Sequence, residues 1–455
     1  MKNYLLKIFD IREGEEQRAL LMFFYIFLII ASLLIIKPVR NSLFLSRFGV
    51  QQLPYAFLLV ALAAVFVSTV YSRISLRFRL NYLIRISLLF SIGSLLLIWY
   101  LLHLNFQAGW FYYLFYVWAA LFAVLITSQF WLLANYVFNA REARRLFGFI
   151  GAGAISGGIF GGYFTKFFAP VFGSVNLLFF CILFLSVSLL IAEFIWKQGA
   201  RRTYRERLLQ QKRIRQTQIP ENAVSTIIKS RHLIYLSALV GVGVIAANLV
   251  DYQYSAIASA QITDKDQLSA FFGFWLSNLS IGSLLIQLFL TGRILRVFGV
   301  SISLLFLPIS ILIGVAAVLF NPALWAAVLL KVSDGSFKNS VNKAGLELLV
   351  LPVASHIKNR IKSYIDVLVD SLATGIGGIL LILAIGELGW SVQQIGFLIA
   401  GLLVLWILLI FRVKSEYLNT FRLALEKRSI DLDEQNISLQ DATVLSSLKD
   451  VLEGN

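Results

Sequence analysis

The stretch ALLMFFYIFLIIASLLII, residues 19–36, contains no charged side chain and is followed at once by Lys37-Pro38-Val39-Arg40-Asn41. An apolar run of this length barely crosses roughly 30 Å of hydrocarbon as a helix. Because residues 42–45 read SLFL, we expect the helix to continue past the proline and to carry Lys37 and Arg40 within the membrane. Ionisable groups at that depth are costly and usually functional, which favours an anion site inside a transporter. The alternative is that both cations snorkel to a membrane interface.

Apolar side chains dominate the whole chain. Of its 455 residues 59% are hydrophobic and 14% are charged, a balance that excludes a soluble globular protein. Continuous apolar runs predict an all-α membrane protein with about twelve transmembrane helices, and their lack of alternation excludes a β-barrel. The predicted helices cover residues 19–46, 54–71, 82–102, 110–134, 147–168, 174–196, 233–256, 268–291, 298–320, 323–348, 363–386 and 391–412.

A basic segment without an apolar run, residues 197–231, divides the helices into two sets of six. We therefore predict an N-terminal half at 1–196, this segment as a cytoplasmic linker, a C-terminal half at 232–412, and a cytoplasmic tail at 413–455. Lysine and arginine concentrate in the loops after even-numbered helices, so both termini are expected on the cytoplasmic side of a bacterial inner membrane. The net charge of +16 reflects this topology, so the lipid bilayer is an expected partner and nucleic acid is not.

Two loops at equivalent places in the halves are similar. Ser72-Arg73-Ile74 follows the second predicted helix, and Gly292-Arg293-Ile294 follows the eighth. The longer stretch, Gly292-Arg293-Ile294-Leu295-Arg296-Val297-Phe298-Gly299, resembles the basic turn between the second and third helices of the major facilitator superfamily. With twelve helices in two halves, the resemblance implies a major-facilitator-like fold with a midplane site between the halves.

The sequence contains no catalytic or metal-binding motif. The single cysteine, Cys181, lies in an apolar run, and the three histidines are scattered at helix ends. The glycine-rich stretch 148–162 lies inside a predicted membrane helix, so we expect its small residues to allow close helix packing rather than phosphate binding. We predict no enzymatic activity, no cofactor and no bound metal.

Charged residues inside two later helices indicate where a site lies. Asp251 is a carboxylate in the seventh predicted helix. The tenth contains Lys331, Asp334 and Lys338, whose spacings of three and four place them on one helical face. We expect Lys331 and Asp334 to be buried and this face to form ion pairs that point into a cavity. For the charged residues that follow on the same helix, burial and exposure to water are both open.

Several short motifs occur in the order known from one family. Trp131-Leu132-Leu133-Ala134-Asn135 matches its Trp-x-x-Ala-Asn motif, and Asn248-Leu249-Val250-Asp251 is similar to its Asn-Leu-Val-Glu. Glu347, with Pro352 after it and Lys338 before it, fits a further segment, and Lys37, Arg40 and Asn41 stand where the family has arginine, lysine and aspartate. The chain therefore resembles the nucleotide translocase family, the ADP/ATP carriers of plastids and obligate intracellular bacteria.

The resemblance implies a transporter that exchanges ATP and ADP by alternating access between its halves. The charges and the motifs together predict a substrate site formed by Lys37, Arg40, Asn41, Asn135, Asp251, Lys331, Asp334, Lys338 and Glu347. The chain also departs from the family, because Leu346 replaces a lysine and the segment 371–377 lacks both family cations. Another anionic or phosphorylated metabolite is therefore an alternative substrate.

The tail supports an alternative of another class. Apolar residues near its end recur at helical spacing and predict an amphipathic helix, which is either a docking helix or the start of a truncated repeat domain. Such a helix fits a cytoplasmic protein partner and a non-transporting membrane scaffold or sensor. We favour the transporter, because a scaffold has no reason to hold so much charge inside the membrane. The apolar residues of this helix are Val444, Leu445, Leu448, Val451 and Leu452.

Overall fold

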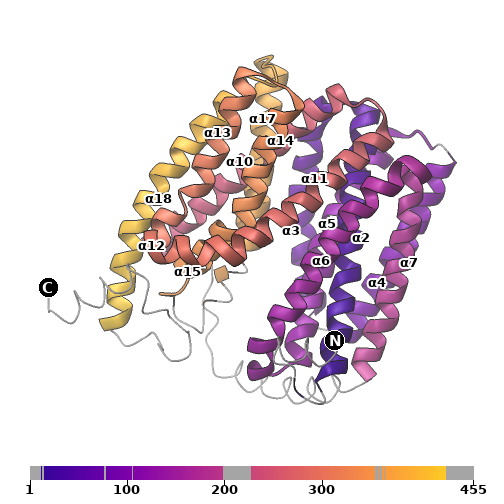
Figure 1. The fold of residues 1–455 in the computed structure, drawn as a ribbon, viewed down its shortest axis with the longest axis horizontal. Helices are drawn as coiled ribbons and strands as arrows, with labels where there is room; N and C mark the ends of the chain where they lie inside the picture. The colour runs from indigo at the N-terminus through magenta and orange to yellow at the C-terminus, as the bar shows by residue number, and fades with distance from the viewer. Residues whose placement is uncertain are drawn as a thin grey trace. The chain divides into compact units, whose positions relative to one another are not determined.

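A computed structural model describes residues 12, 15–75, 78–104, 106–197, 227–353, 358, 361–362 and 364–426, and these contain helices and no strand (Figure 1). The first set of helices is α2 (Glu16–Phe48), η1 (Val50–Gln52), α3 (Leu53–Ser75), α4 (Leu80–His103), α5 (Gly109–Val137), α6 (Ala140–Phe172) and α7 (Ser174–Ile195). The second is α10 (Arg231–Gln261), α11 (Lys265–Leu285), η3 (Ile286–Thr291), α12 (Gly292–Ser303), α13 (Phe306–Phe320), α14 (Leu324–Phe337), η4 (Lys338–Asn342), α15 (Lys343–Leu349), η5 (Ile365–Val369), α17 (Asp370–Ile382), η6 (Leu383–Glu387) and α18 (Ile395–Glu426).

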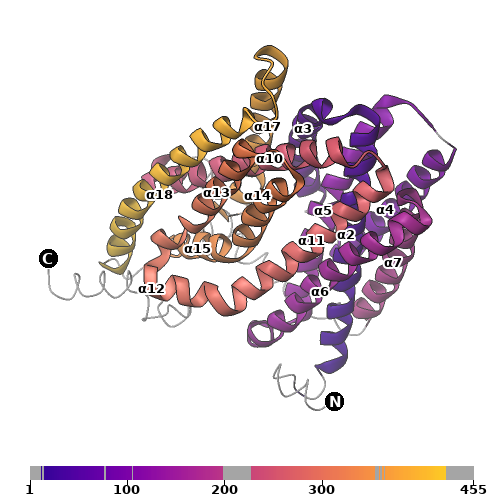
Figure 2. The same ribbon diagram turned by 45° about the horizontal axis from the view of Figure 1, so that its top comes forward.

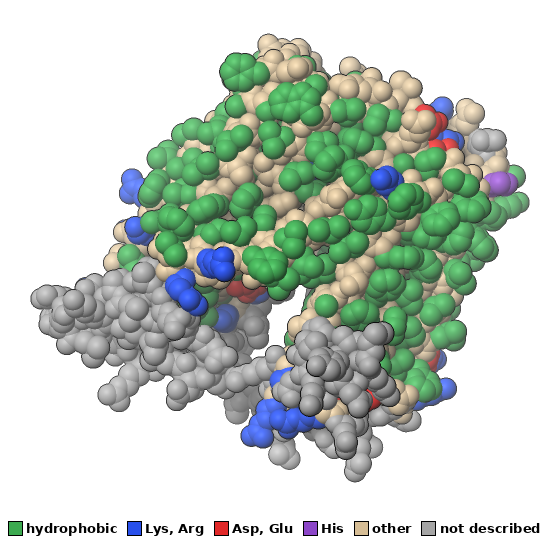
Figure 3. Space-filling view, viewed as in Figure 1, with side chains coloured by type: hydrophobic (Ala, Val, Ile, Leu, Met, Phe, Trp, Pro, Cys, Tyr) green, Lys and Arg blue, Asp and Glu red, His purple; other side chains and the backbone are tan. Residues whose placement is uncertain are grey.

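Each predicted membrane segment overlaps one or more of these helices. Within the described residues ten helices are long and apolar enough to cross a membrane. Two predicted segments do not correspond to any of these ten. Residues 298–303 end the long span Lys265–Ser303, and the rest of the segment 298–320 is the shorter apolar helix α13. In the segment 323–348, charged residues interrupt α14, η4 and α15. Hydrophobic side chains cover the visible helix faces with few charges among them, as lipid contact requires (Figure 3).

The structure divides into two compact units. The first contains α2, α4 to α7, residues 66–75 of α3 and residues 265–281 of α11. The second contains residues 53–65 of α3, α10, the end of α11 and all later helices. Two helices, α3 and α11, thus contribute to both units, a feature absent from the predicted division by sequence. The predicted linker, apart from its ends, and the tail beyond 426 lie outside the described residues.

The first unit is built around α2, which packs against α5, α6 and α7 (Figure 1). The glycines of α6 make the closest of these contacts possible. A Cβ on Gly153, Gly157 or Gly161 would meet the backbone carbonyl of Phe23, Phe27 or Ala31, respectively. Both sets recur every four residues, so one glycine row lies along one row of α2. The expectation that the glycine-rich stretch serves helix packing is confirmed.

Helix α6 begins at Ala140, seven residues before the predicted start. Asn139 forms a capping box with Glu142, in which each side chain accepts a hydrogen bond of 2.9 Å from the other residue's backbone N–H. Two ion pairs hold this charged first turn, Arg18 with Glu142 at 3.3 Å and Arg145 with Glu15 at 2.8 Å. Hydropathy missed the turn because the residues that form it are polar.

The second unit is built around α10, which packs against α14, α17 and α18. The chain turns within α12 before it enters α13 (Figure 2). Gly299 adopts a φ of 73° within this region, a conformation that favours glycine. The turn allows α13 to pack along α14 and α18.

Candidate functional site

The two cations of the first helix lie within one unbroken helix. Helix α2 continues through Pro38 to Phe48, as predicted, so Lys37 and Arg40 are flanked by helix on both sides. Both side chains are half-buried. The Arg40 guanidinium donates to the backbone oxygen of Tyr116 at 3.1 Å and to Asn41 Oδ1 at 3.2 Å, and it lies 4.1 Å from the centre of the Tyr116 ring. These contacts hold the cation against α5 and leave part of it accessible.

A buried ion-pair triad joins α10 to α14. Lys331 Nζ lies 2.5 Å from a carboxylate oxygen of Asp251 and 3.1 Å from one of Asp334. The side chains of Lys331 and Asp334 are 12% and 4% exposed, whereas that of Asp251 is 37% exposed. The predicted burial of Lys331 and Asp334 and their pairing across one helical turn are confirmed. The ion pair with Asp251 joins α14 to α10. With one lysine and two carboxylates, the triad carries one net negative charge.

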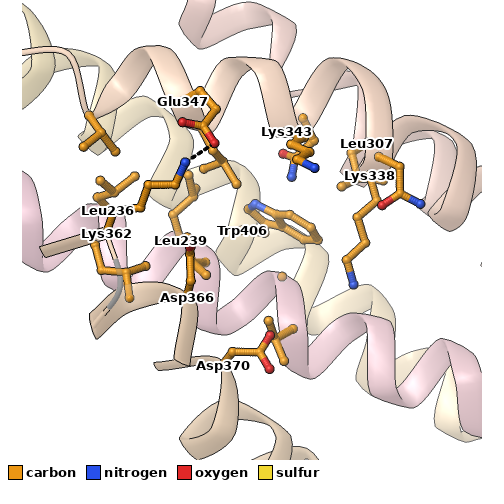
Figure 4. A pocket seen from close by; sticks show the side chains of 18 residues that line it. Leu236, Leu239, Leu307, Lys338, Lys343, Glu347, Lys362, Asp366, Asp370 and Trp406 are labelled. Carbon is orange, nitrogen blue, oxygen red and sulfur yellow. Dashed lines mark hydrogen bonds and ion pairs between the residues drawn. The ribbon is translucent and has the colours of Figure 1, made fainter. Parts of the chain in front are cut away.

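A cavity of about 590 Å³ lies inside the second unit, among α10, η4, α15, η5, α17 and α18. One wall is apolar and includes Leu236 and Leu239 of α10 and the indole of Trp406. The facing walls present charged side chains from η4, α15 and η5 (Figure 4). The volume falls in the range of about 300–1,000 Å³ that is typical of small-molecule sites.

Six charged side chains line this cavity, and among the described residues only two of them form an ion pair within 4 Å. Lys362 forms an ion pair with Glu347, and both are partly exposed. Lys338 extends from η4 into the cavity, toward the side on which Asp370 lies (Figure 4). Within the described part of the chain, no carboxylate lies within 4 Å of Lys338 Nζ. A lysine that is half-buried and has no such partner can bind an anion that enters the cavity.

Two features shape the cavity wall. Segments η4 and η5 are π-helical, and such wide turns often occur at functional sites because they redirect side chains. Opposite them, Trp406 packs directly over Gly243, where an added Cβ would lie 2.9 Å from the indole. Gly243 therefore provides the space that the indole ring occupies.

The structure brings some of the predicted site residues together. Asp251, Lys331 and Asp334 form the triad, and Lys338 and Glu347 line the cavity of the same unit. Lys37, Arg40 and Asn41 lie on α2 of the other unit, and Asn135 is exposed on α5. The predicted ladder does not extend to Lys338, which has no ion pair with Asp334. The role of all nine residues in substrate binding stays a prediction.

Sequence reasoning missed several residues of the cavity. Asp366 and Asp370 are four residues apart in an apolar segment, a spacing that places them on one helical face, and this signal was available. Trp406 gave no signal, because an aromatic residue in a membrane helix is commonplace. Within the described residues no group of three His, Cys, Asp or Glu side chains could hold a metal ion.

Comparison with known proteins gives two kinds of similarity. The family model described as TLC ATP/ADP transporter matches residues 96–331. "ADP,ATP carrier protein 1" of Chlamydia trachomatis serovar D is 23% identical over 340 residues, which cover 66% of this chain and 64% of that carrier. "ADP,ATP carrier protein 1" of Chlamydia pneumoniae is 22% identical over 97% of both chains. The chain thus spans slightly less than two thirds of the first of these relatives.

Solved transporter structures share the fold. The nucleoside transporter NupG (D323A mutant) superposes with a TM-score of 0.64 at 13% identity, covering 87% of this chain and 99% of that one. A POT family transporter in complex with 5-aminolevulinic acid gives 0.62 at 11% identity, covering 89% and 96%. The prediction of an all-helical, major-facilitator-like membrane protein is confirmed.

Proposed function

Because the chain belongs to the TLC ATP/ADP transporter family, we propose that it is a membrane carrier that exchanges nucleotides of the ATP and ADP type. The resemblance inferred from the short motifs agrees with this family. The observation that carries the proposal is Lys338, a cation without an ion-pair partner among the described residues, in a cavity large enough for a small molecule. Fixed cations replace the hydration that a phosphate loses on leaving water.

In the proposed mechanism, a phosphate group of the substrate contacts Lys338 in the cavity of the second unit. Alternating access exposes the bound substrate to each side of the membrane in turn, by movement of one helical half against the other. Asp251 and Glu347 offset excess positive charge, since each is paired with a lysine in this structure. The chain's own chemistry is binding and release, without a covalent step.

The multi-pass architecture also supports a location. We place the carrier in a bacterial inner membrane with both termini cytoplasmic, because the basic loops follow the even-numbered helices. A non-transporting scaffold with a partner-binding tail is the competing hypothesis, and that tail lies outside the described residues. It predicts that Lys338 can be removed without any change in solute movement.

Uptake of labelled ATP and ADP into proteoliposomes, with and without internal nucleotide, tests the proposal. Uptake that requires internal nucleotide is expected. Lys338→Ala should lower transport efficiency about 10- to 100-fold, the value of one charge-assisted contact of about 1.5–3 kcal/mol. Lys265→Ala is the matched control, because Lys265 is exposed at the start of α11 and does not line the cavity. A folded protein that moves no nucleotide, or a Lys338→Ala variant as active as the control, would contradict the proposal.

A further inference from the structure

Lys338 and Asp370 are opposite charges that line the cavity of the second unit. Lys338 is the first residue of η4 and Asp370 is the first residue of α17, so the two charges come from separate helical segments. The lysine extends toward the side of the cavity on which the carboxylate lies (Figure 4). Among the described residues Lys338 forms no ion pair within 4 Å, so more than this distance separates the two charged groups. A ligand that enters the cavity can therefore lie between them.

The charges around Asp370 make Lys338 its counter-ion. Lys338 attracts the Asp370 carboxylate, whereas the neighbouring acid Asp366 repels it. The cavity faces of α10, α13 and α18 contribute no titratable side chain within the described residues. The charges that act on Asp366 are a different set, Lys343, Glu347 and Lys362. Lys338 and Asp370 therefore balance each other across the cavity, apart from the charges at Asp366.

The backbone around Asp370 is held against α10. Val369 and Ala373 flank Asp370 and lie near Gly241, where an added Cβ would be 3.6 Å from the valine and 4.0 Å from the alanine. This packing fixes the start of α17, because a close-packed helix end does not move without losing its contacts. The Asp370 side chain is exposed at the cavity. A phosphate bound to Lys338 consequently stays close to a second negative charge.

A phosphate that binds Lys338 takes over the cation that Asp370 attracts. The carboxylate then loses its counter-ion and repels the bound phosphate. For like charges about 10 Å apart at an effective dielectric constant of about 20, this repulsion weakens binding roughly tenfold. Weaker binding favours turnover in a carrier, since differences in affinity appear mainly in the rate of release.

We propose that Asp370 competes with the substrate phosphate for Lys338 and thereby promotes substrate release, an inference that rests on the proposed nucleotide transport. Asp370 acts through Lys338 and is a positioning residue, since it repels the phosphate rather than binding it. Glu347 has a different role, because its ion pair is with Lys362. Asp370 therefore sets how tightly nucleotides of the ATP and ADP type are held, without changing which nucleotides bind.

Binding of radiolabelled ATP and ADP to the purified full chain in lipid nanodiscs tests the competition. Asp370→Asn should strengthen the binding of both nucleotides roughly tenfold, because the amide neither attracts Lys338 nor repels a phosphate. Asp366→Asn makes the same chemical change one turn away and should have a smaller effect, since Lys338 is not among the charges that act on Asp366. Glu387→Gln is the matched control, because Glu387 is exposed in η6 and does not line the cavity.

The pH dependence of binding separates competition from a structural effect of the substitution. The ratio of the native dissociation constant to that of Asp370→Asn should be about ten at about pH 8 and smaller at about pH 5, because acid neutralises Asp370 in the native chain alone. Protonation of the nucleotide, of Asp366 and of Glu347 occurs in both proteins and largely cancels in this ratio. Asp370→Glu should keep the native affinity and pH dependence, since it keeps the carboxylate.

Exchange in proteoliposomes provides a kinetic measurement of the same effect. Asp370→Asn should lower both KM and kcat, because tighter binding to Lys338 also slows the release of the substrate. A substitution that merely disturbs the fold would lower kcat without lowering KM.

The outcomes distinguish this inference from the proposed function. Unchanged or weaker nucleotide binding by Asp370→Asn, an equal effect of Asp366→Asn, or a ratio that does not vary with pH overturns the inference while nucleotide binding stands. If the monodisperse native chain binds neither nucleotide, the proposed function fails as well. Should Asp370→Asn not fold, Asp370→Ala removes the same charge and is judged by the same results.

Discussion

Replacing Lys331 with methionine should destabilise the protein more than removing Asp251, the more exposed of its two carboxylate partners. The side chain of Asp334 is 4% exposed and Lys331 is its only ion-pair partner among the described residues. Without the lysine this carboxylate is an uncompensated charge at membrane depth, which costs about 3 kcal/mol. Asp251 loses the same partner, but its side chain is 37% exposed, so water can solvate its carboxylate. The loss of this contact should lower the free energy of unfolding by less than about 1 kcal/mol.

The comparison variants follow from the same geometry. Asp251→Asn leaves the pair of Lys331 and Asp334 intact, so it should cost less than about 1 kcal/mol. Lys331→Met combined with Asp334→Asn removes both buried charges and should recover most of the lost stability, since a neutral pair of similar volume replaces a buried ion pair at little cost.

Reversible unfolding in mixed micelles of SDS and a mild detergent, followed by tryptophan fluorescence, measures these differences. A loss of about 3 kcal/mol lowers the ratio of folded to unfolded protein more than 100-fold at fixed SDS. The reasoning is refuted if Lys331→Met and Asp251→Asn are equally stable, or if the double variant is no more stable than Lys331→Met.

Three further predictions concern packing and surface pairs, each measured by the same unfolding assay. Gly157→Ala should lower the free energy of unfolding by about 1–3 kcal/mol, because the added Cβ meets the Phe27 carbonyl. Gly148→Ala, which has open space around the added Cβ, should be neutral or slightly stabilising. Equal effects of the two substitutions would count against the α2–α6 contact. Asn139→Ala removes the cap of α6 and should cost about 1 kcal/mol, and no loss would show that the cap is dispensable. Glu347→Gln breaks only a partly exposed pair, so a loss above about 1 kcal/mol would be unexpected.

Most of the fold could be predicted from the sequence, because long uninterrupted apolar runs identify membrane helices. The errors lie at helix ends that water or charge stabilises. Helix α6 starts early because Asn139 and Glu142 cap it, and α18 continues to Glu426, well past the predicted 412, through residues that hydropathy does not favour. Nothing in the sequence indicated that α3 and α11 contribute to both units. Hydropathy locates a membrane helix but does not show which other helices it packs against.

The candidate site was predictable only within single helices. Lys331 and Asp334 are one turn apart, and their pairing followed from helical geometry. Asp251 was recognised as an unusual carboxylate, but its partner lies 80 residues away and could not be assigned. Likewise Lys338, Asp370 and Trp406 line one cavity but come from three separate segments. The spacing of polar and apolar residues within one helix cannot predict which residues of other helices complete the cavity wall.

The π-helical segment η4 has a consequence for how relatives are aligned. A π turn holds about one residue more than an α turn, so the residues on either side of Lys338–Asn342 are out of phase by roughly 100° with an unbroken α-helix. If regular α-helical periodicity is assumed from Lys331 to Glu347, the residues after η4 are therefore assigned to the wrong face of the helix. Between homologues as distant as 22–23% identity, a single-residue gap belongs inside η4 wherever a relative has regular helix there. An alignment without that gap would pair each cavity-lining position after η4 with a neighbouring position of the relative, about 100° away around the helix.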